Sequence, residues 1–111
     1  MKITHEDYDQ LSVVTLRGDL AAELADELRK LAIDRMSHNV RDFVLDASGM
    51  EFVDSQGLEA LLWLQDQASE KLGQVRIAAL SENVRKILEI TRLATRFDCH
   101  PDVDSAVKSL R

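Results

Sequence analysis

The residue types best suited to chemistry lie in one short segment, Val53-Asp54-Ser55-Gln56-Gly57-Leu58. Apolar residues follow it at helical spacing, so we expect the Asp54 carboxylate to cap a helix and Val53 to pack against Leu58. Ser55 then takes the first helical position, with its hydroxyl on the surface, and a phosphate is tolerated there because helix N-termini favour anions. The segment is therefore either a purely structural cap or a serine whose phosphorylation switches binding.

Helical geometry defines the surface next to Ser55. At about 100° per residue, Ser55 shares a stripe with Glu59 and Asp66, while Gln56 lines up with Glu59 and Trp63. Trp63 falls off the main apolar seam of this helix. It is either an exposed anchor of a protein interface or a core residue at the rim of the sheet, and both interpretations remain open.

Other arrangements for catalysis or metal binding are missing from the sequence. His5, His38 and His100 do not pair at the i, i+4 spacing of a helical metal site. Ser55 lacks the first glycine of a G-x-S-x-G nucleophile elbow, because Val53 stands there, and the 4 glycines are too scattered for a phosphate-binding loop. Cys99 fits a buried small apolar residue better than a reactive thiol. We therefore expect neither an enzyme nor a bound cofactor or metal.

The composition narrows the class of protein. The chain has 111 residues and a net charge of −6, which opposes binding to nucleic acid or anionic membranes. Its longest apolar run, Ala60 to Leu64, is far too short to insert into a bilayer. One cysteine excludes an intramolecular disulfide scaffold, and the N-terminal residues show none of the features of a signal peptide. We expect a single domain spanning residues 1–111, located in the cytoplasm.

The charge is distributed unevenly along the chain. Residues 51–72 carry five acids against one lysine, a net of −4, whereas residues 85–96 carry four basic residues against one acid, a net of +3. These stretches are either two solvated helix faces or charged surfaces that steer a partner.

Hydrophobic periodicity predicts alternating strands and helices. Strands are expected over residues 1–8, 11–17, 42–47, 75–80 and 97–99, and helices over residues 20–36, 55–72, 82–91 and 101–110. We expect Asp19 and Ser81 to cap two of the helices, and Gly73 to end another by adopting a left-handed conformation. The alternation requires right-handed crossovers. The predicted fold is α/β, with about four helices packed on a five-stranded, mainly parallel sheet whose N-terminal hairpin is antiparallel.

The segment around Ser55 resembles the signature of the STAS domain, the fold of bacterial anti-sigma factor antagonists. The resemblance extends over nearly the whole chain in the right order. It is carried by Leu16-Arg17-Gly18-Asp19-Leu20, Val44-Leu45-Asp46, Gly49, Phe52 to Leu58, and Ala79-Leu80-Ser81 through Val84, Leu88, Thr91 and Leu93. Three positions depart from the family pattern. Gln56 replaces the usual Ser or Thr, Ala21 a frequent aspartate, and Arg92 a common glycine.

This resemblance implies a competition controlled by phosphorylation. In the family, the unphosphorylated antagonist binds an anti-sigma factor, a serine kinase of the histidine-kinase-like ATPase fold, and so releases a sigma factor. The kinase phosphorylates the serine that matches Ser55, and a PP2C-type phosphatase reverses the reaction. Asp54 would orient this serine. The implied partner-binding residues are Asp19, Asp54, Ser55, Gln56, Gly57, Glu59 and Trp63.

Two other functions compete with this one. STAS domains also serve lipid-transport and anion-transport complexes, so the chain is alternatively a constitutive interaction subunit of a transporter. A third interpretation is a small-ligand or nucleotide site at the helix N-terminus beside Ser55. The sequence leaves the partner and the oligomeric state open.

Overall fold

A computed structural model describes residues 2–110 and places five strands in one sheet, in the order β1-β2-β3-β4-β5. The strand β1 pairs antiparallel with β2, and all other neighbouring strands are parallel, which confirms the predicted mixed sheet. Met1, included in the predicted first strand, lies outside the described residues. The strands are β1 (Lys2–Tyr8), β2 (Leu11–Arg17), β3 (Asp42–Gly49), β4 (Val75–Ala78) and β5 (Asp98–His100).

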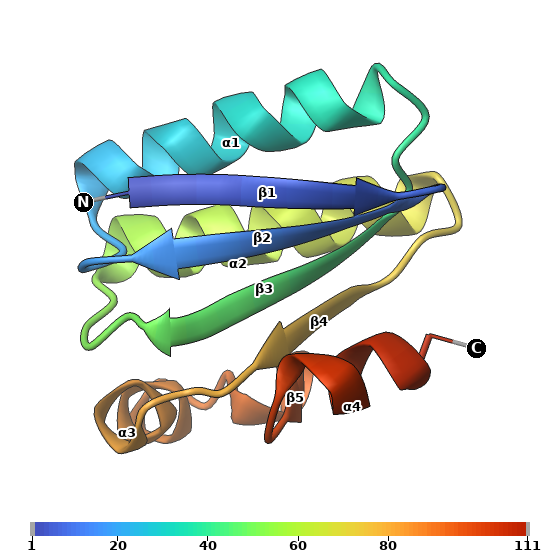
Figure 1. Cartoon of the computed structure of the whole chain (residues 1–111). Coiled ribbons are helices and arrows are strands. Elements are labelled where there is room, and N and C mark those ends of the chain that lie inside the picture. The colour runs from blue at the N-terminus through green and yellow to red at the C-terminus, as the bar shows by residue number, and fades with distance from the viewer. Residues whose placement is uncertain (1, 111) are drawn as a thin grey trace.

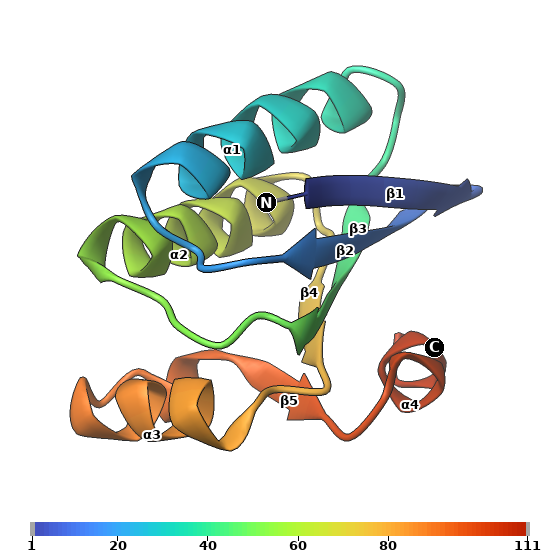
Figure 2. The ribbon, with the colours of Figure 1, turned by 60° about the vertical axis from the view of Figure 1, so that its left-hand side comes forward.

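Helices cover the two faces of the sheet unequally. One face carries both α1 and α2, whereas the other carries the short α4 (Figures 1 and 2). The helix α3 lies beyond the carboxyl end of β4. The helices are α1 (Ala22–Met36), α2 (Ser55–Glu70), α3 (Glu82–Ile90) and α4 (Val103–Lys108), with a 3-10 turn, η1 (Ala94–Arg96), before β5.

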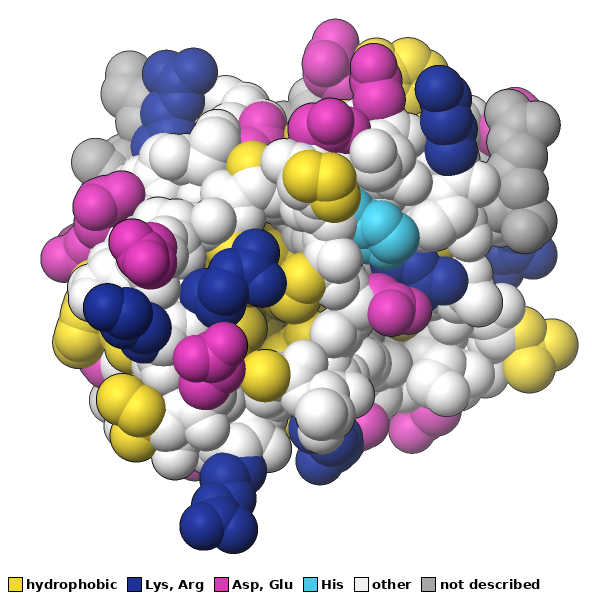
Figure 3. Space-filling view, turned by 90° about the horizontal axis from the view of Figure 1, so that it is seen from below, with side chains coloured by type: hydrophobic (Ala, Val, Ile, Leu, Met, Phe, Trp, Pro, Cys, Tyr) yellow, Lys and Arg dark blue, Asp and Glu magenta, His cyan; other side chains and the backbone are white. Residues whose placement is uncertain are grey.

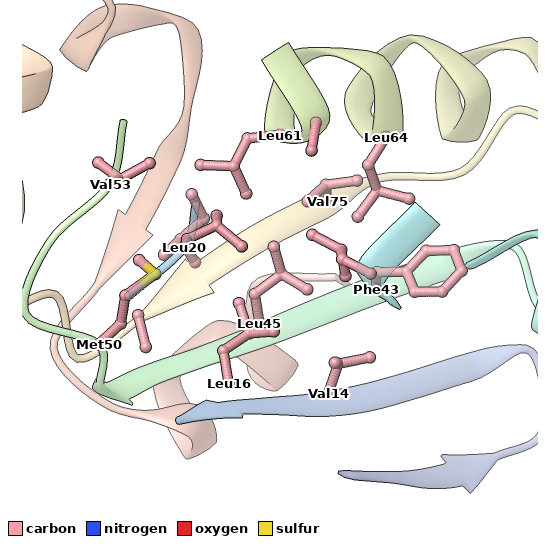
Figure 4. Packing of buried hydrophobic residues seen from close by; sticks show 14 of the residues in the cluster. Val14, Leu16, Leu20, Phe43, Leu45, Met50, Val53, Leu61, Leu64 and Val75 are labelled. Atoms are coloured by element: carbon pink, nitrogen blue, oxygen red, sulfur yellow. The ribbon is translucent and has the colours of Figure 1, made fainter. Parts of the chain in front are cut away.

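The main hydrophobic core lies between the sheet and the pair α1 and α2. Alternate residues of β2, among them Val14 and Leu16, face it and are fully buried. Three loop residues from the carboxyl ends of β2 and β3, namely Leu20, Met50 and Val53, are also buried in this cluster (Figure 4). Because close packing in the core fixes these residues, the two loops have a defined conformation.

The start of α1 differs from the prediction. The N-cap is Ala21, with extended backbone angles of φ −122° and ψ −165°, and no side chain caps the helix. Asp19 therefore does not cap this helix, because α1 begins later than the apolar pattern indicated and leaves Asp19 two residues before the N-cap. The helix begins with its free N–H groups unpaired by a capping side chain.

The end of α2 also differs in its backbone detail. The helix ends at Glu70, and Leu72, not Gly73, takes the left-handed conformation, with φ 62°. Gly73 is needed for another reason: a Cβ at this position would lie 1.9 Å from the carbonyl oxygen of Arg41. The predicted role of Gly73 was wrong because close approach to another segment, a tertiary constraint, determines the residue.

Among the remaining boundaries, β4 ends at Ala78 instead of continuing to residue 80, and β5 begins one residue later than expected. The Ser81 hydroxyl accepts a hydrogen bond from the Val84 N–H at 3.2 Å, which confirms the predicted cap of α3. At the last helix, Asp102 is the N-cap and accepts a hydrogen bond from the Ser105 N–H at 2.8 Å.

The uncapped start of α1 leads to a stability prediction. The substitution Ala21→Ser places a hydroxyl at an N-cap whose backbone is already extended, so we expect the free energy of unfolding to rise by about 1 kcal/mol. Urea unfolding followed by circular dichroism measures this change. The matched control Ala22→Ser, one residue inside the helix and exposed, should give no gain; equal effects of the two substitutions would contradict the capping argument.

Candidate functional site

Two loops at the carboxyl end of the sheet are joined through their backbones. The Leu20 N–H donates to the Phe52 carbonyl at 2.9 Å, and the Leu20 carbonyl accepts from the Asp54 N–H at 3.2 Å. These bonds form a parallel bridge between Leu20 and Val53 beyond the ends of β2 and β3. The loop that contains Asp19 is therefore held beside the segment that leads into α2.

The first turn of α2 lies against the same loop. A Cβ on Gly57 would meet the Leu20 carbonyl oxygen at 2.1 Å and the Val53 Cγ2 atom at 2.7 Å, so only glycine fits here. The Asp54 carboxylate accepts a hydrogen bond from the Gly57 N–H at 2.9 Å, which confirms the predicted cap. The cap and the close approach together fix the direction in which α2 leaves the loop.

Ser55 is the first residue of α2 and is exposed, as the sequence predicted. Within residues 2–110, its hydroxyl forms no hydrogen bond with another side chain or with the backbone. The exposed side chains of Gln56 and Glu59 flank it, and Asp19 is exposed on the adjoining loop. The structure thus places three of the expected contact residues on segments next to the accessible hydroxyl of a fourth, Ser55.

The other three expected contact residues have different environments. Asp54 is partly buried by its capping role, and Gly57 is buried. Trp63 is partly buried and packs against the main core, which favours the core-rim interpretation over an exposed anchor. Gly57 therefore contributes to the site by letting the backbone of α2 pack against Leu20.

Two residues of the site were not predicted from the sequence. Phe52 is 44% exposed although it directly precedes the buried Val53, and its backbone is held by Leu20. The Asn83 side chain donates to the Glu51 carbonyl at 2.9 Å and so ties α3 to the loop before Ser55. An aromatic residue next to the motif was a usable signal for Phe52, whereas nothing in the sequence indicated Asn83.

Acidic side chains are exposed on the three segments that build the site. Asp19 lies on the loop after β2, Glu51 on the loop after β3 and Glu59 in the second turn of α2, whose first turn contains no acidic residue. The carboxylate of Asp54 caps the positive end of this helix. A phosphate on Ser55 would approach this end of the helix from solvent.

The basic segment after residue 85 lies on another face. Arg85, Lys86, Arg92 and Arg96 are exposed on α3 and the turns that follow it. Seen from below, this face shows acidic and basic side chains interspersed around a hollow lined by hydrophobic groups (Figure 3). The mixed charges favour a solvated helix face over a uniformly basic partner surface.

Outside the Ser55 site, the described residues provide no metal-binding cluster, no reactive thiol and no membrane-spanning helix. Among residues 2–110, no three His, Cys, Asp or Glu side chains lie close enough to hold a metal ion. Burial raises the pKa of the Cys99 thiol, which keeps it protonated and unreactive at neutral pH. Over the same residues, no helix combines the length and the apolar character needed to cross a membrane.

A model of the STAS domain family matches residues 2–106, almost the full length of the chain. The chain belongs to the STAS domain family. Its five-stranded sheet with four helices, and the capped helix that begins at Ser55, are therefore this family's architecture in the present sequence.

The STAS chain is similar to several anti-sigma factor antagonists. BtrV of Bordetella bronchiseptica, a candidate member of this class, is 25% identical over 97 residues, which cover 87% of this chain and 84% of BtrV. An antagonist from Mycobacterium paratuberculosis has a TM-score of 0.79 at 27% identity, covering 99% of this chain and 93% of that structure. Unphosphorylated SpoIIAA from Bacillus has a TM-score of 0.86 at 18% identity, covering 99% and 96%.

The STAS fold also occurs within transporters. The murine anion transporter Slc26a9 matches with a TM-score of 0.75 at 20% identity, over 95% of this chain but only 18% of the transporter. The fold alone therefore does not choose between a partner-switching protein and a transporter domain.

The close approach at Gly57 gives the site its first prediction. The substitution Gly57→Ala forces a Cβ against the Leu20 backbone, and we expect it to lower the free energy of unfolding by about 2 kcal/mol or more. Chemical unfolding measures the loss. The control is Gly49→Ala, where the added atom comes no closer than 3.1 Å to Arg17 Cγ and 3.2 Å to the Leu16 carbonyl oxygen, so the cost should be smaller. A Gly57→Ala protein as stable as the native chain would show that α2 can move away from the loop freely.

Proposed function

We propose that this STAS chain is an anti-sigma factor antagonist whose binding is switched off by phosphorylation of Ser55. The observation that carries the proposal is the exposed hydroxyl of Ser55 at the first position of a helix whose start is held by Asp54, Gly57 and Leu20. A phosphate can be added there without displacing any packed group. Modification would then change the surface and leave the fold intact.

The charge of the site explains how a phosphate would act. It adds roughly −1.5 to −2 charges to a surface that already carries Asp19, Glu51 and Glu59. A partner surface complementary to the unmodified site meets both the bulk of the phosphate and a stronger negative potential. The similarity to SpoIIAA, which has been solved in unphosphorylated and phosphorylated forms, supports this interpretation.

The proposed partner is an anti-sigma factor that is also a serine kinase of the histidine-kinase-like ATPase fold. The kinase supplies ATP and the catalytic groups, so the chain acts as its substrate and ligand without enzymatic activity of its own. Asp54 positions Ser55, while Gln56, Glu59, Asp19 and the exposed ring of Phe52 form the surface around it. A PP2C-type phosphatase restores binding, and all these proteins meet in the bacterial cytoplasm.

A second candidate function is a constitutive STAS subunit of a transport complex, which the likeness to an anion transporter favours. In that case Ser55 carries no phosphate and the chain stays with a membrane-associated assembly. Affinity purification from native cells, followed by mass spectrometry of Ser55 in the bound and free fractions, separates the two. A serine kinase in the bound fraction and phosphate in the free fraction support the switch; a transport ATPase with unmodified Ser55 supports the alternative.

The switch predicts opposite behaviour for two substitutions at Ser55. The Ser55→Ala protein should bind the copurified kinase with native affinity but accept no phosphate from ATP. The Ser55→Asp protein should bind at least about tenfold more weakly, because a negative charge is fixed at the interface. Titration calorimetry with the purified kinase measures both affinities.

Ser69→Asp provides the matched control for this experiment. Ser69 is exposed on the same helix, near its other end, so the substitution adds the same charge far from Ser55. We expect it to bind like the native chain. Equal affinities of the Ser55→Ala and Ser55→Asp proteins would refute the switch.

A further inference from the structure

The second face of the sheet is only half covered. Five strands at a spacing of about 4.8 Å span about 19 Å, which is enough for two helices of about 10 Å diameter side by side. The first face carries two helices, α1 and α2, but among the described residues the second carries α4 alone, which packs chiefly on β3, β4 and β5. The β1 and β2 half of this face therefore lies open beside α4 (Figures 1 and 2).

A groove of about 530 Å³ follows this open half. Its floor continues a small second core between α4 and the sheet, in which Val44 of β3, Ala78 of β4 and Ala106 of α4 are buried. The ring of Tyr8, 56% exposed, stands at the outer edge of the groove. The apolar lining consists of Tyr8, Leu11, Val13, Val103 and Val107.

The charges of the groove lie along its two walls. Glu6 lies on the β1 wall, and Asp104 and Lys108 lie one helical turn apart on the α4 wall. Each wall thus carries a carboxylate, and the groove has two acids against one base. The β1 wall is therefore acidic, whereas the α4 wall pairs a carboxylate with an ammonium group, and the groove has a net charge of −1. An apolar floor beside an acidic wall is complementary to an apolar helix stripe flanked by basic residues on the side of Glu6.

We infer that this groove binds an amphipathic helix of another protein, with apolar residues in the groove and Lys or Arg along the flank that faces Glu6. The bound helix completes the second layer of the sheet next to α4, as α2 does next to α1 on the first face. Ser55 belongs to the helix layer on that first face, so the groove and the Ser55 surface can be occupied together. The inference is independent of the phosphorylation switch.

A defined pair of designed peptides tests the groove directly. The ¹⁵N-labelled full chain is titrated with a 14-residue peptide of two heptads. Leu occupies the first, fourth and fifth positions of each heptad, and Lys occupies the others. We expect saturable shifts of the amides of Leu11, Val13, Val103 and Val107. The same peptide with Glu in place of every Lys should bind at least about fivefold more weakly, because it faces two carboxylates.

Substitutions on the walls and at the edge sharpen the test. The double substitution Glu6→Gln, Asp104→Asn should reduce the difference between the two peptides, since both carboxylates are exposed and their removal leaves the core intact. Tyr8→Ala should weaken the Lys peptide severalfold. The control Ile33→Ala removes an apolar side chain of similar exposure, 58%, from α1 and should leave binding unchanged.

Three outcomes would overturn the inference. One is a set of shifts centred on the acidic surface of α2, which would indicate nonspecific attraction of a basic peptide by an acidic protein. Another is equal binding of the Lys and Glu peptides. The third is a concentration-dependent shift of the groove amides without peptide, which would assign this surface to a second copy of the chain.

Discussion

The Leu20 carbonyl group, in contact with the backbone of α2 at Gly57, is the constraint on which the site depends. This oxygen accepts a hydrogen bond from Asp54 and lies where a Cβ of residue 57 would stand. The loop after β2, the loop after β3 and the first turn of α2 therefore form one rigid junction. Ser55 stands on this junction with its hydroxyl in solvent, so a stable core presents a reactive group that takes no part in holding the core together.

Parts of this arrangement follow from local sequence and parts do not. The order of strands and helices, the antiparallel N-terminal hairpin and the caps formed by Asp54 and Ser81 were predictable, because each depends on periodicity or on side chains within three residues. The exposure of Ser55 followed from its place at the helix start. The carboxyl ends of parallel strands lie at one edge of the sheet, so the proximity of Asp19 to this helix could also be predicted.

The predictions for Gly73 and Asp19 failed for different physical reasons. Gly73 was assigned a left-handed conformation, yet its small size is required by the Arg41 backbone, 32 positions earlier in the chain, and Leu72 adopts the strained angles instead. Asp19 was assigned as a cap because an apolar pattern does not distinguish a helix that begins at residue 20 from one that begins two residues later, at Ala22. The link from Asn83 to Glu51, like the contact at Gly73, joins segments that only the folded chain brings together.

The sheet has another property that concerns synthesis more than binding. Its strands are arranged in the same order in space as along the chain, so each new strand finds its neighbour already made when it leaves the ribosome. Such sequential pairing limits each parallel closure to one strand–helix–strand unit, as in the pairing of Leu11 with Asp42, and lets the sheet grow from the N-terminus. By the time Glu70 has been synthesised, β1 to β3, α1 and α2 are all present, so the junction that carries Ser55 is assembled by the first two thirds of the polypeptide. The segment that follows supplies the far edge of the sheet and the helix that packs on its second face.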